Sequence, residues 1–104
     1  MTYIDRLDNF HRYLLYHDVP PHAQLLYFHL LNLNNQLGWQ ENFCITDRRL
    51  EYSTGLSEKL IADAKRILSN IGFVRTKTKK KNSCSVTTYV FPDVVSELPE
   101  ERRE

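Results

Sequence analysis

The basic side chains best placed to bind an anion are concentrated in one short stretch of the sequence. Arg75, Lys77, Lys79, Lys80 and Lys81 fall within seven residues. Alternate residues of a strand share a face, so Arg75, Lys77 and Lys79 should project together. Such a cluster favours an anionic partner, because phosphate contacts give nucleic-acid affinity that is largely independent of base sequence. The alternative is that lysines on an exposed hairpin protect a sheet edge against aggregation.

A helix-turn-helix is expected just before this basic stretch. Ser57 is a typical N-cap, and apolar residues then recur at three- and four-residue spacing until Gly72 ends the helix. These apolar residues are Ile61, Ala64, Leu68 and Ile71. A shorter helix is expected from Thr46 to Tyr52, with Leu50 in the core and Gly55 in the connecting turn. The second helix of such a motif is the one that enters the major groove of DNA.

The exposed face of this second helix has two interpretations. Ser57, Lys59 and Arg66 should point away from the core, and the two bases could contact phosphate or guanine. Glu58 and Asp63 lie on the same face and would repel phosphate. The face is therefore alternatively a solvated surface of mixed charges, paired at three- or four-residue spacing.

The other segments complete a mainly helical α+β pattern. Two helices come first, at Ile4–Tyr16 and His22–Leu37, separated by two prolines that break the first and start the second. Asn34 to Gln36 are expected to fray at the end of the second. Strands are expected at Trp39–Ile45, Phe73–Thr78 and Ser85–Phe91, with Lys79–Ser83 as a turn. This order predicts a winged helix-turn-helix with a C-terminal β-hairpin wing and two N-terminal helices.

Composition indicates one globular domain of ordinary hydrophobicity, at 104 residues and 41% hydrophobic. The net charge of +1 conceals an asymmetry, because residues 1–92 carry 12 Lys+Arg and 8 Asp+Glu, whereas residues 93–104 carry 2 and 5. We interpret residues 1–92 as the domain. Residues 93–104 are interpreted as an acidic tail, or a linker to a missing C-terminal domain. Neither a long apolar run nor a signal peptide is visible, so we expect a cytoplasmic location and no membrane partner.

Catalytic and metal-binding residues are not expected. His22 and His29 lie two turns apart on one helix, too far to share a metal ion. Cys44 and Cys84 lack metal-ligand spacing, which favours two free thiols, although a disulfide would be possible if their strands were neighbours. No nucleophile–histidine grouping and no glycine-rich phosphate loop is visible. We therefore expect neither an enzyme nor a cofactor.

Aromatic residues of the first helix are candidates for self-association. Phe10, Tyr13 and Tyr16 lie close together in the sequence, and aromatic residues are enriched at protein interfaces. A homo-oligomer is expected on this interpretation. The alternative is simple core packing.

Several short motifs between residues 25 and 90 are shared with a known family. They are Leu26-Tyr27, Leu30-Leu31-Asn32, Leu37-Gly38-Trp39, Phe43-x-Ile45-Thr46, Thr54-Gly55-Leu56-Ser57 and Gly72-Phe73-Val74. On these residues the chain resembles the N-terminal domain of DnaD-like replication initiation proteins, which include phage replisome organisers. The resemblance implies a winged helix that self-associates, binds DNA in some members and recruits helicase-loading proteins.

The sequence thus predicts a DNA-binding and assembly module for replication initiation. It would bind duplex DNA mainly through phosphates, using the wing and the helix-turn-helix. The candidate contacts are Ser57, Lys59, Arg66, Arg75, Lys77, Lys79, Lys80 and Lys81. The alternatives are an oligomerisation or protein-docking module that does not bind DNA, and a transcriptional regulator.

Overall fold

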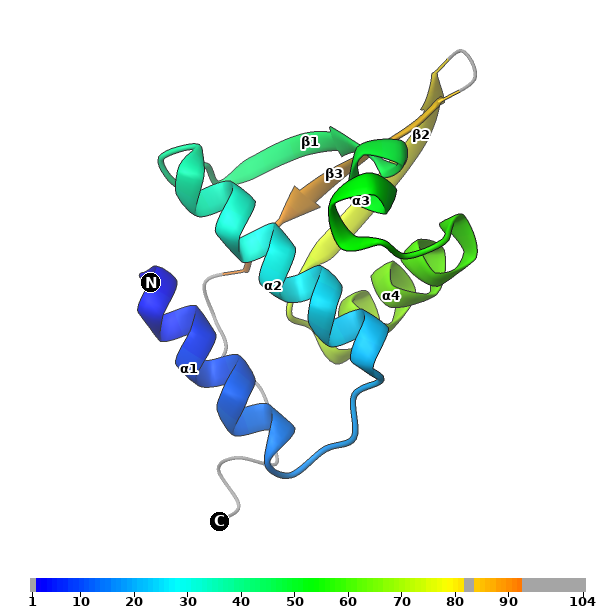
Figure 1. Ribbon diagram of the computed structural model, residues 1–104. Helices are drawn as coiled ribbons and strands as arrows, with labels where there is room; N and C mark the ends of the chain where they lie inside the picture. Colours follow the sequence, from blue (N-terminus) through cyan, green and yellow to red (C-terminus); the bar gives the residue numbers. More distant parts are fainter. Residues whose placement is uncertain (1, 82–83, 93–104) are drawn as a thin grey trace.

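The computed structural model of the protein describes residues 2–81 and 84–92. Within this part the elements follow in the order α1 (Tyr3–Leu14), α2 (Pro21–Gln36), β1 (Asn42–Thr46), α3 (Asp47–Thr54), α4 (Glu58–Ile71), β2 (Arg75–Lys81) and β3 (Cys84–Val90) (Figure 1). The fold is therefore α+β and mainly helical, as the sequence predicts. The predicted tail or linker, residues 93–104, lies outside the described residues.

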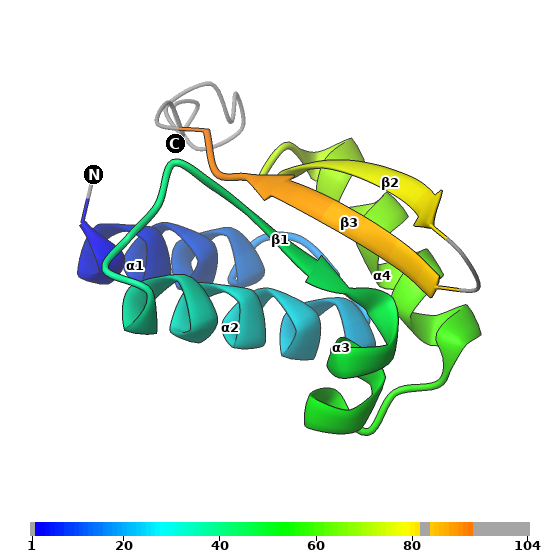
Figure 2. The ribbon, with the colours of Figure 1, turned by 90° about the horizontal axis from the view of Figure 1, so that it is seen from above.

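The three strands form one antiparallel sheet in the order β1-β3-β2. Viewed from above, β2 and β3 lie in front of α4, so helices cover one face of the sheet (Figure 2). Phe43, Thr87 and Tyr89 point toward this covered side and are buried. The residues that alternate with them lie on the opposite face, which no described helix covers.

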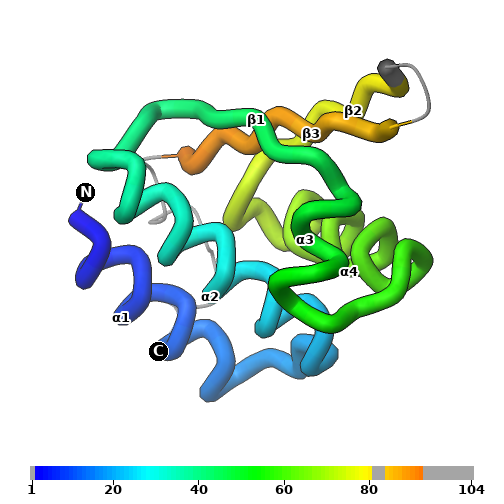
Figure 3. Tube along the Cα trace, turned by 45° about the horizontal axis from the view of Figure 1, so that its top comes forward, coloured from blue at the N-terminus to red at the C-terminus, as the bar shows by residue number. Residues whose placement is uncertain are grey.

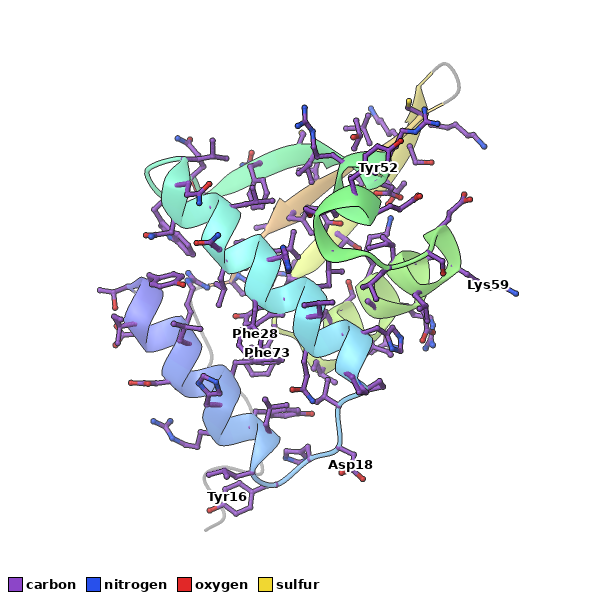
Figure 4. All side chains as sticks on the ribbon, in the orientation of Figure 1. Tyr16, Asp18, Phe28, Tyr52, Lys59 and Phe73 are labelled. Carbon is purple, nitrogen blue, oxygen red and sulfur yellow. The ribbon has the colours of Figure 1, made fainter. Side chains whose placement is uncertain are left out.

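The hydrophobic core is organised around α2, which buries one face at three- and four-residue spacing from Ala23 to Asn34. Helix α1 lies alongside α2 (Figure 3), and the Phe10 ring joins them by packing 4.3 Å from Tyr27 and 5.1 Å from Phe73, centroid to centroid. Phe28 and Phe73 meet in the same cluster (Figure 4). Leu68 of α4 is fully buried, as expected from its place on the apolar face.

The predicted starts of α3 and α4 are confirmed by their caps, whereas α3 continues two residues beyond the predicted end at Tyr52. The Thr46 and Ser57 hydroxyls accept hydrogen bonds from the backbone N–H of Arg49 and Leu60, both at 3.2 Å. Gly55 has a φ of 80°, in the left-handed region where a residue with a Cβ is strained. The chain therefore turns sharply between α3 and α4, which fixes the angle at which α4 leaves the turn.

The predicted self-association surface is wrong for two of its three residues. Phe10 is 0% exposed and Tyr13 is 9% exposed, because both rings pack in the core of the same chain. Core packing therefore accounts for both. Tyr16, by contrast, is 62% exposed and points away from the body beyond the end of α1 (Figure 4). Self-association through Tyr16 stays a prediction.

Two local predictions are also wrong. Asn34 does not fray, because its buried side chain donates to the Gln40 carbonyl oxygen and accepts from the Gln40 N–H, both at 2.9 Å. This pair of bonds closes the loop that leads from α2 into β1. Lys79, Lys80 and Lys81 are not in a turn, since they pair with β3 and extend β2 to Lys81.

Candidate nucleic-acid interface

The uncovered face of the sheet is a basic surface. Arg75, Lys77 and Lys79 are all exposed at alternate positions of β2, which places successive cations roughly 7 Å apart. Each lies beside a residue of β3 across the ladder. We call the following set the outer face: Arg75, Lys77, Lys79, Val86, Thr88, Val90 and Cys44.

Strand β1 extends the outer face on its other side. Cys44 and Lys77 both lie opposite Thr88, so the three side chains form a row across the sheet. The Cys44 sulfur is 3.2 Å from the Thr88 hydroxyl oxygen. The outer face surrounds a hollow of about 510 Å³. No carboxylate is among the described residues that line this hollow, so its three cations are not neutralised there.

The predicted basic cluster is divided by strand alternation. Lys80 lies on the other side of β2 from the outer face. It lines a cleft of about 340 Å³ that β2 and β3 form with α3 and the start of α4. Three carboxylates line that cleft, those of Asp47, Glu51 and Glu58. Arg48 is the other base that lines the cleft, so its three carboxylates outnumber its two bases, and the excess would repel phosphate. The side chain of Lys81 lies outside the described residues.

The exposed face of α4 has no net positive charge. Lys59 extends into solvent near the start of the helix (Figure 4), beside Glu58. The Arg66 guanidinium donates to the Asp63 carboxylate, one turn earlier. Two bases and two acids therefore balance on this face, as the alternative interpretation of the sequence expects. The Ser57 hydroxyl is engaged as the N-cap.

Asp63 also binds a residue that is distant in sequence. Its second carboxylate oxygen lies 2.8 Å from Nε2 of His22 at the start of α2. The hydrogen bond from His22, followed by that from Arg66, lowers the pKa of Asp63 below its ordinary value. Asp63 is therefore charged at neutral pH, and it holds Arg66 in an ion pair.

We expect His22→Phe to raise the pKa of Asp63 toward its ordinary value. The substitution keeps a ring but removes the hydrogen bond that contributes most to the shift. An NMR titration of the side-chain carboxyl resonances measures the change. Asp5 is the internal control, because its lowered pKa comes from Thr2 and should not move. An unchanged Asp63 titration in the variant would contradict the assigned contact.

A buried polar network joins α3, α4, β2 and β3. The Lys65 ammonium donates to Asp47 at 2.9 Å, to Thr78 at 2.9 Å and to Thr87 at 3.0 Å. The Thr87 hydroxyl donates to the other Asp47 oxygen at 2.8 Å. All three ammonium protons thus have acceptors. Burial, and then the negative charge of Asp47, raise the pKa of Tyr89 beside this network.

The network fixes β2 and β3 against α3 and α4. Lys65 comes from α4, Asp47 from the first turn of α3, and the two threonines from neighbouring positions of β2 and β3. The Lys65 and Asp47 side chains are only 10% and 15% exposed, so water competes weakly for these bonds. The sequence did not lead us to predict that Lys65 is buried. A lysine one residue from the apolar face of a helix was nevertheless a signal for a buried ion pair.

Cys44 and Cys84 are free thiols, as the sequence favours. Within residues 2–81 and 84–92, no three His, Cys, Asp or Glu side chains come together in a way that could hold a metal ion. Across the same residues, no helix has the length and apolar character needed to cross a membrane.

The comparisons with known proteins do not indicate what this surface binds. No protein-family model, curated protein or solved structure matches the chain.

Proposed function

We propose that this chain is a winged-helix domain that binds the phosphate backbone of nucleic acid through the outer face. The strand order β1-β3-β2 and the helix-turn-helix of α3 and α4 support the winged-helix assignment. The motifs shared with DnaD-like replication initiation proteins support a role in starting DNA replication. In that role, further copies of the chain and helicase-loading proteins are the proposed partners.

One observation carries the proposal. Arg75, Lys77 and Lys79 are exposed side by side, and no described acid lines the hollow beside them. Such unpaired like charges repel one another, and a polyanion removes that repulsion. Because lysine is a flexible point charge without the planar fork of arginine, the contacts should depend little on base sequence.

This mode differs from groove reading by α4. The bases of α4 are balanced by Glu58 and Asp63, and Asp63 already holds Arg66. The cleft that β2 and β3 form with α3 and α4 adds two more carboxylates, those of Asp47 and Glu51, to its bases Arg48 and Lys80. We therefore assign the main affinity to the outer face and not to the helix that a helix-turn-helix usually inserts in DNA.

The test compares two variants that remove three positive charges each. One replaces Arg75, Lys77 and Lys79 with glutamine. The control replaces Arg12, Lys59 and Arg66, which are exposed on α1 and α4. Fluorescence anisotropy with a labelled duplex, at several salt concentrations, gives the slope of log K against log salt for each protein.

The outer-face variant should flatten this slope by about 2.7, or about 0.9 for each of three lost phosphate contacts. With single-stranded DNA the change should be about 2.1. The control variant has the same net charge as the outer-face variant, but its outer face is intact. It should therefore keep the slope of the parent. Equal slopes for parent and outer-face variant would refute the proposal, as would a parent that shows no salt-dependent binding.

A protein-docking module is the second candidate function. Tyr52 on α3 is 77% exposed and Leu60 on α4 is 41% exposed, and both lie on the helix-turn-helix whose charges balance. Exposed apolar side chains on a neutral surface are suited to a protein partner. A parent protein that does not bind nucleic acid would favour this candidate. A loss of nucleic-acid binding in the control variant alone would not favour it.

A further inference from the structure

The outer face carries its charge on one side only. All of its cations lie on the edge strand β2. The central strand β3 contributes a half-buried floor of Val86, Thr88 and Val90, which lines the hollow. The other edge strand, β1, contributes the uncharged Asn42 and Cys44 opposite this floor. A ligand on this face therefore meets positive charge along β2 and methyl groups beside it.

The row of cations is suited to one strand of a double helix. Alternate residues of β2 are about 7 Å apart, so the three cations form a line about 13 Å long. Consecutive phosphates of one nucleic-acid strand advance about 3.4 Å along the helix axis and also turn around it, so the distance between them is about twice that advance. A second row of phosphates on the sheet would lie across a groove, over β1, which has no charged residue. The cations of this face therefore serve a single strand.

The floor has no aromatic ring on which a separated base can stack. Proteins that bind single strands on a sheet place aromatic side chains on its exposed face. In this fold Phe43 of β1 and Tyr89 of β3 point toward the helices and are buried. None of the described residues that line the hollow is aromatic. The outer face therefore suits a strand whose bases are already stacked within a duplex.

The floor also distinguishes the sugars of DNA and RNA. Strand β3 lies about 4.8 Å from β2, so the sugars that link phosphates bound along β2 reach Val86 and Val90. A deoxyribose presents C–H groups to these methyl groups, whereas the 2′-hydroxyl of a ribose loses water there without gaining a hydrogen bond. Thr88 supplies a hydroxyl, but it already lies 3.2 Å from the Cys44 sulfur. The floor is therefore better matched to deoxyribose.

We infer that the outer face selects duplex DNA. Three consecutive phosphates of one strand bind the cations of β2, and the adjoining deoxyriboses rest on Val86 and Val90. This inference rests on the proposed function, and it adds the class of nucleic acid and the residues that select it. The cations supply affinity for any nucleic acid, and the two valines supply the preference.

The experiment compares ligands and variants at one salt concentration. Fluorescence anisotropy measures the Kd for a duplex DNA, for a duplex RNA of the same sequence and for each DNA strand alone. Val86→Thr with Val90→Thr adds two hydroxyls to the floor at similar side-chain size, keeps every cation and introduces a good strand former. The control, Ile4→Thr with Leu15→Thr, adds hydroxyls at exposed positions on α1 and its C-cap, away from the sheet (Figure 1).

The parent should bind the duplex DNA at least about tenfold more tightly than the duplex RNA or either single strand. In the valine variant the ratio of the two duplex affinities should fall toward one, while the salt dependence stays that of the parent. The control should keep the parental ratio. Equal affinity of the parent for the two duplexes would overturn the inference, as would tighter binding of a single strand. A ratio that the valine substitutions leave unchanged would overturn it too.

The same measurements separate this inference from the proposed function. Suppose that the parent binds every ligand equally, and that this binding is lost when Arg75, Lys77 and Lys79 are replaced with glutamine. The proposed function would then stand, and the preference for duplex DNA would be removed. A parent that binds none of the ligands would overturn both.

Discussion

Lys65→Ala should lower the free energy of unfolding by about 3–5 kcal/mol, the range found when one partner of a buried ion pair is removed. The truncation leaves the Asp47 carboxylate, which is 15% exposed, with the Thr87 hydroxyl as its remaining side-chain partner among the described contacts. It also removes the donor that joins α4 to both wing strands. A domain of this size should melt at least about 12 °C lower.

A double-mutant cycle with Asp47→Ala identifies the cause. If the ion pair carries the effect, the double variant should be clearly less destabilised than the sum of the two single variants, with a coupling of about 0.5–3 kcal/mol. The substitution Lys59→Ala, on the exposed side of the same helix, is the control and should change stability by less than about 0.5 kcal/mol. A Lys65→Ala protein that melts within a degree of the parent would show that the network is not formed.

Phe10→Ala should cost about 3–5 kcal/mol, as is typical for a buried phenylalanine. Its ring is 0% exposed and packs against rings of α2 and of the segment before β2, so its loss leaves a cavity between α1 and the rest of the core. Chemical denaturation of the parent and the variant measures the difference. Tyr16→Ala, six residues later and exposed, should be nearly neutral in the same assay. A neutral Phe10→Ala would mean that α1 does not pack on α2.

Local rules of the sequence predicted the frame of the fold. Ser57 and Thr46 act as caps, Gly55 and Gly72 take positive φ, and Leu68 is buried on the predicted apolar face. Each of these features depends on residues close together in the chain. The end of β2 was mispredicted, because lysine is a weak strand former and only pairing with β3 keeps Lys79–Lys81 extended.

The candidate site was only partly predictable. Alternation placed Arg75, Lys77 and Lys79 on one face, and this does not require knowledge of the tertiary fold. The same alternation places Lys80 on the other face, but the carboxylates that share its cleft depend on how α3 and α4 pack against the strands. The balanced charges of α4 were predictable, because its acids and bases lie at local spacing, whereas the contact of His22 with Asp63 spans 41 positions of the chain. No local pattern reports such a pairing.

The arrangement gives the domain two surfaces with different electrostatic character. The outer face concentrates positive charge, whereas the helix-turn-helix presents balanced charges together with Tyr52 and Leu60. The buried Lys65 network holds the two surfaces in a fixed relation. This fixed relation leaves each surface accessible when the other is occupied.

The central claim is that nucleic acid contacts the outer face, and an NMR titration of the ¹⁵N-labelled chain with a short duplex tests it most directly. We expect the largest amide shift changes in the row formed by Cys44, Thr88 and Lys77 and at its neighbours Arg75 and Lys79. The amides of α4 should change little. Shift changes concentrated on α4, with the outer face unaffected, would contradict the account.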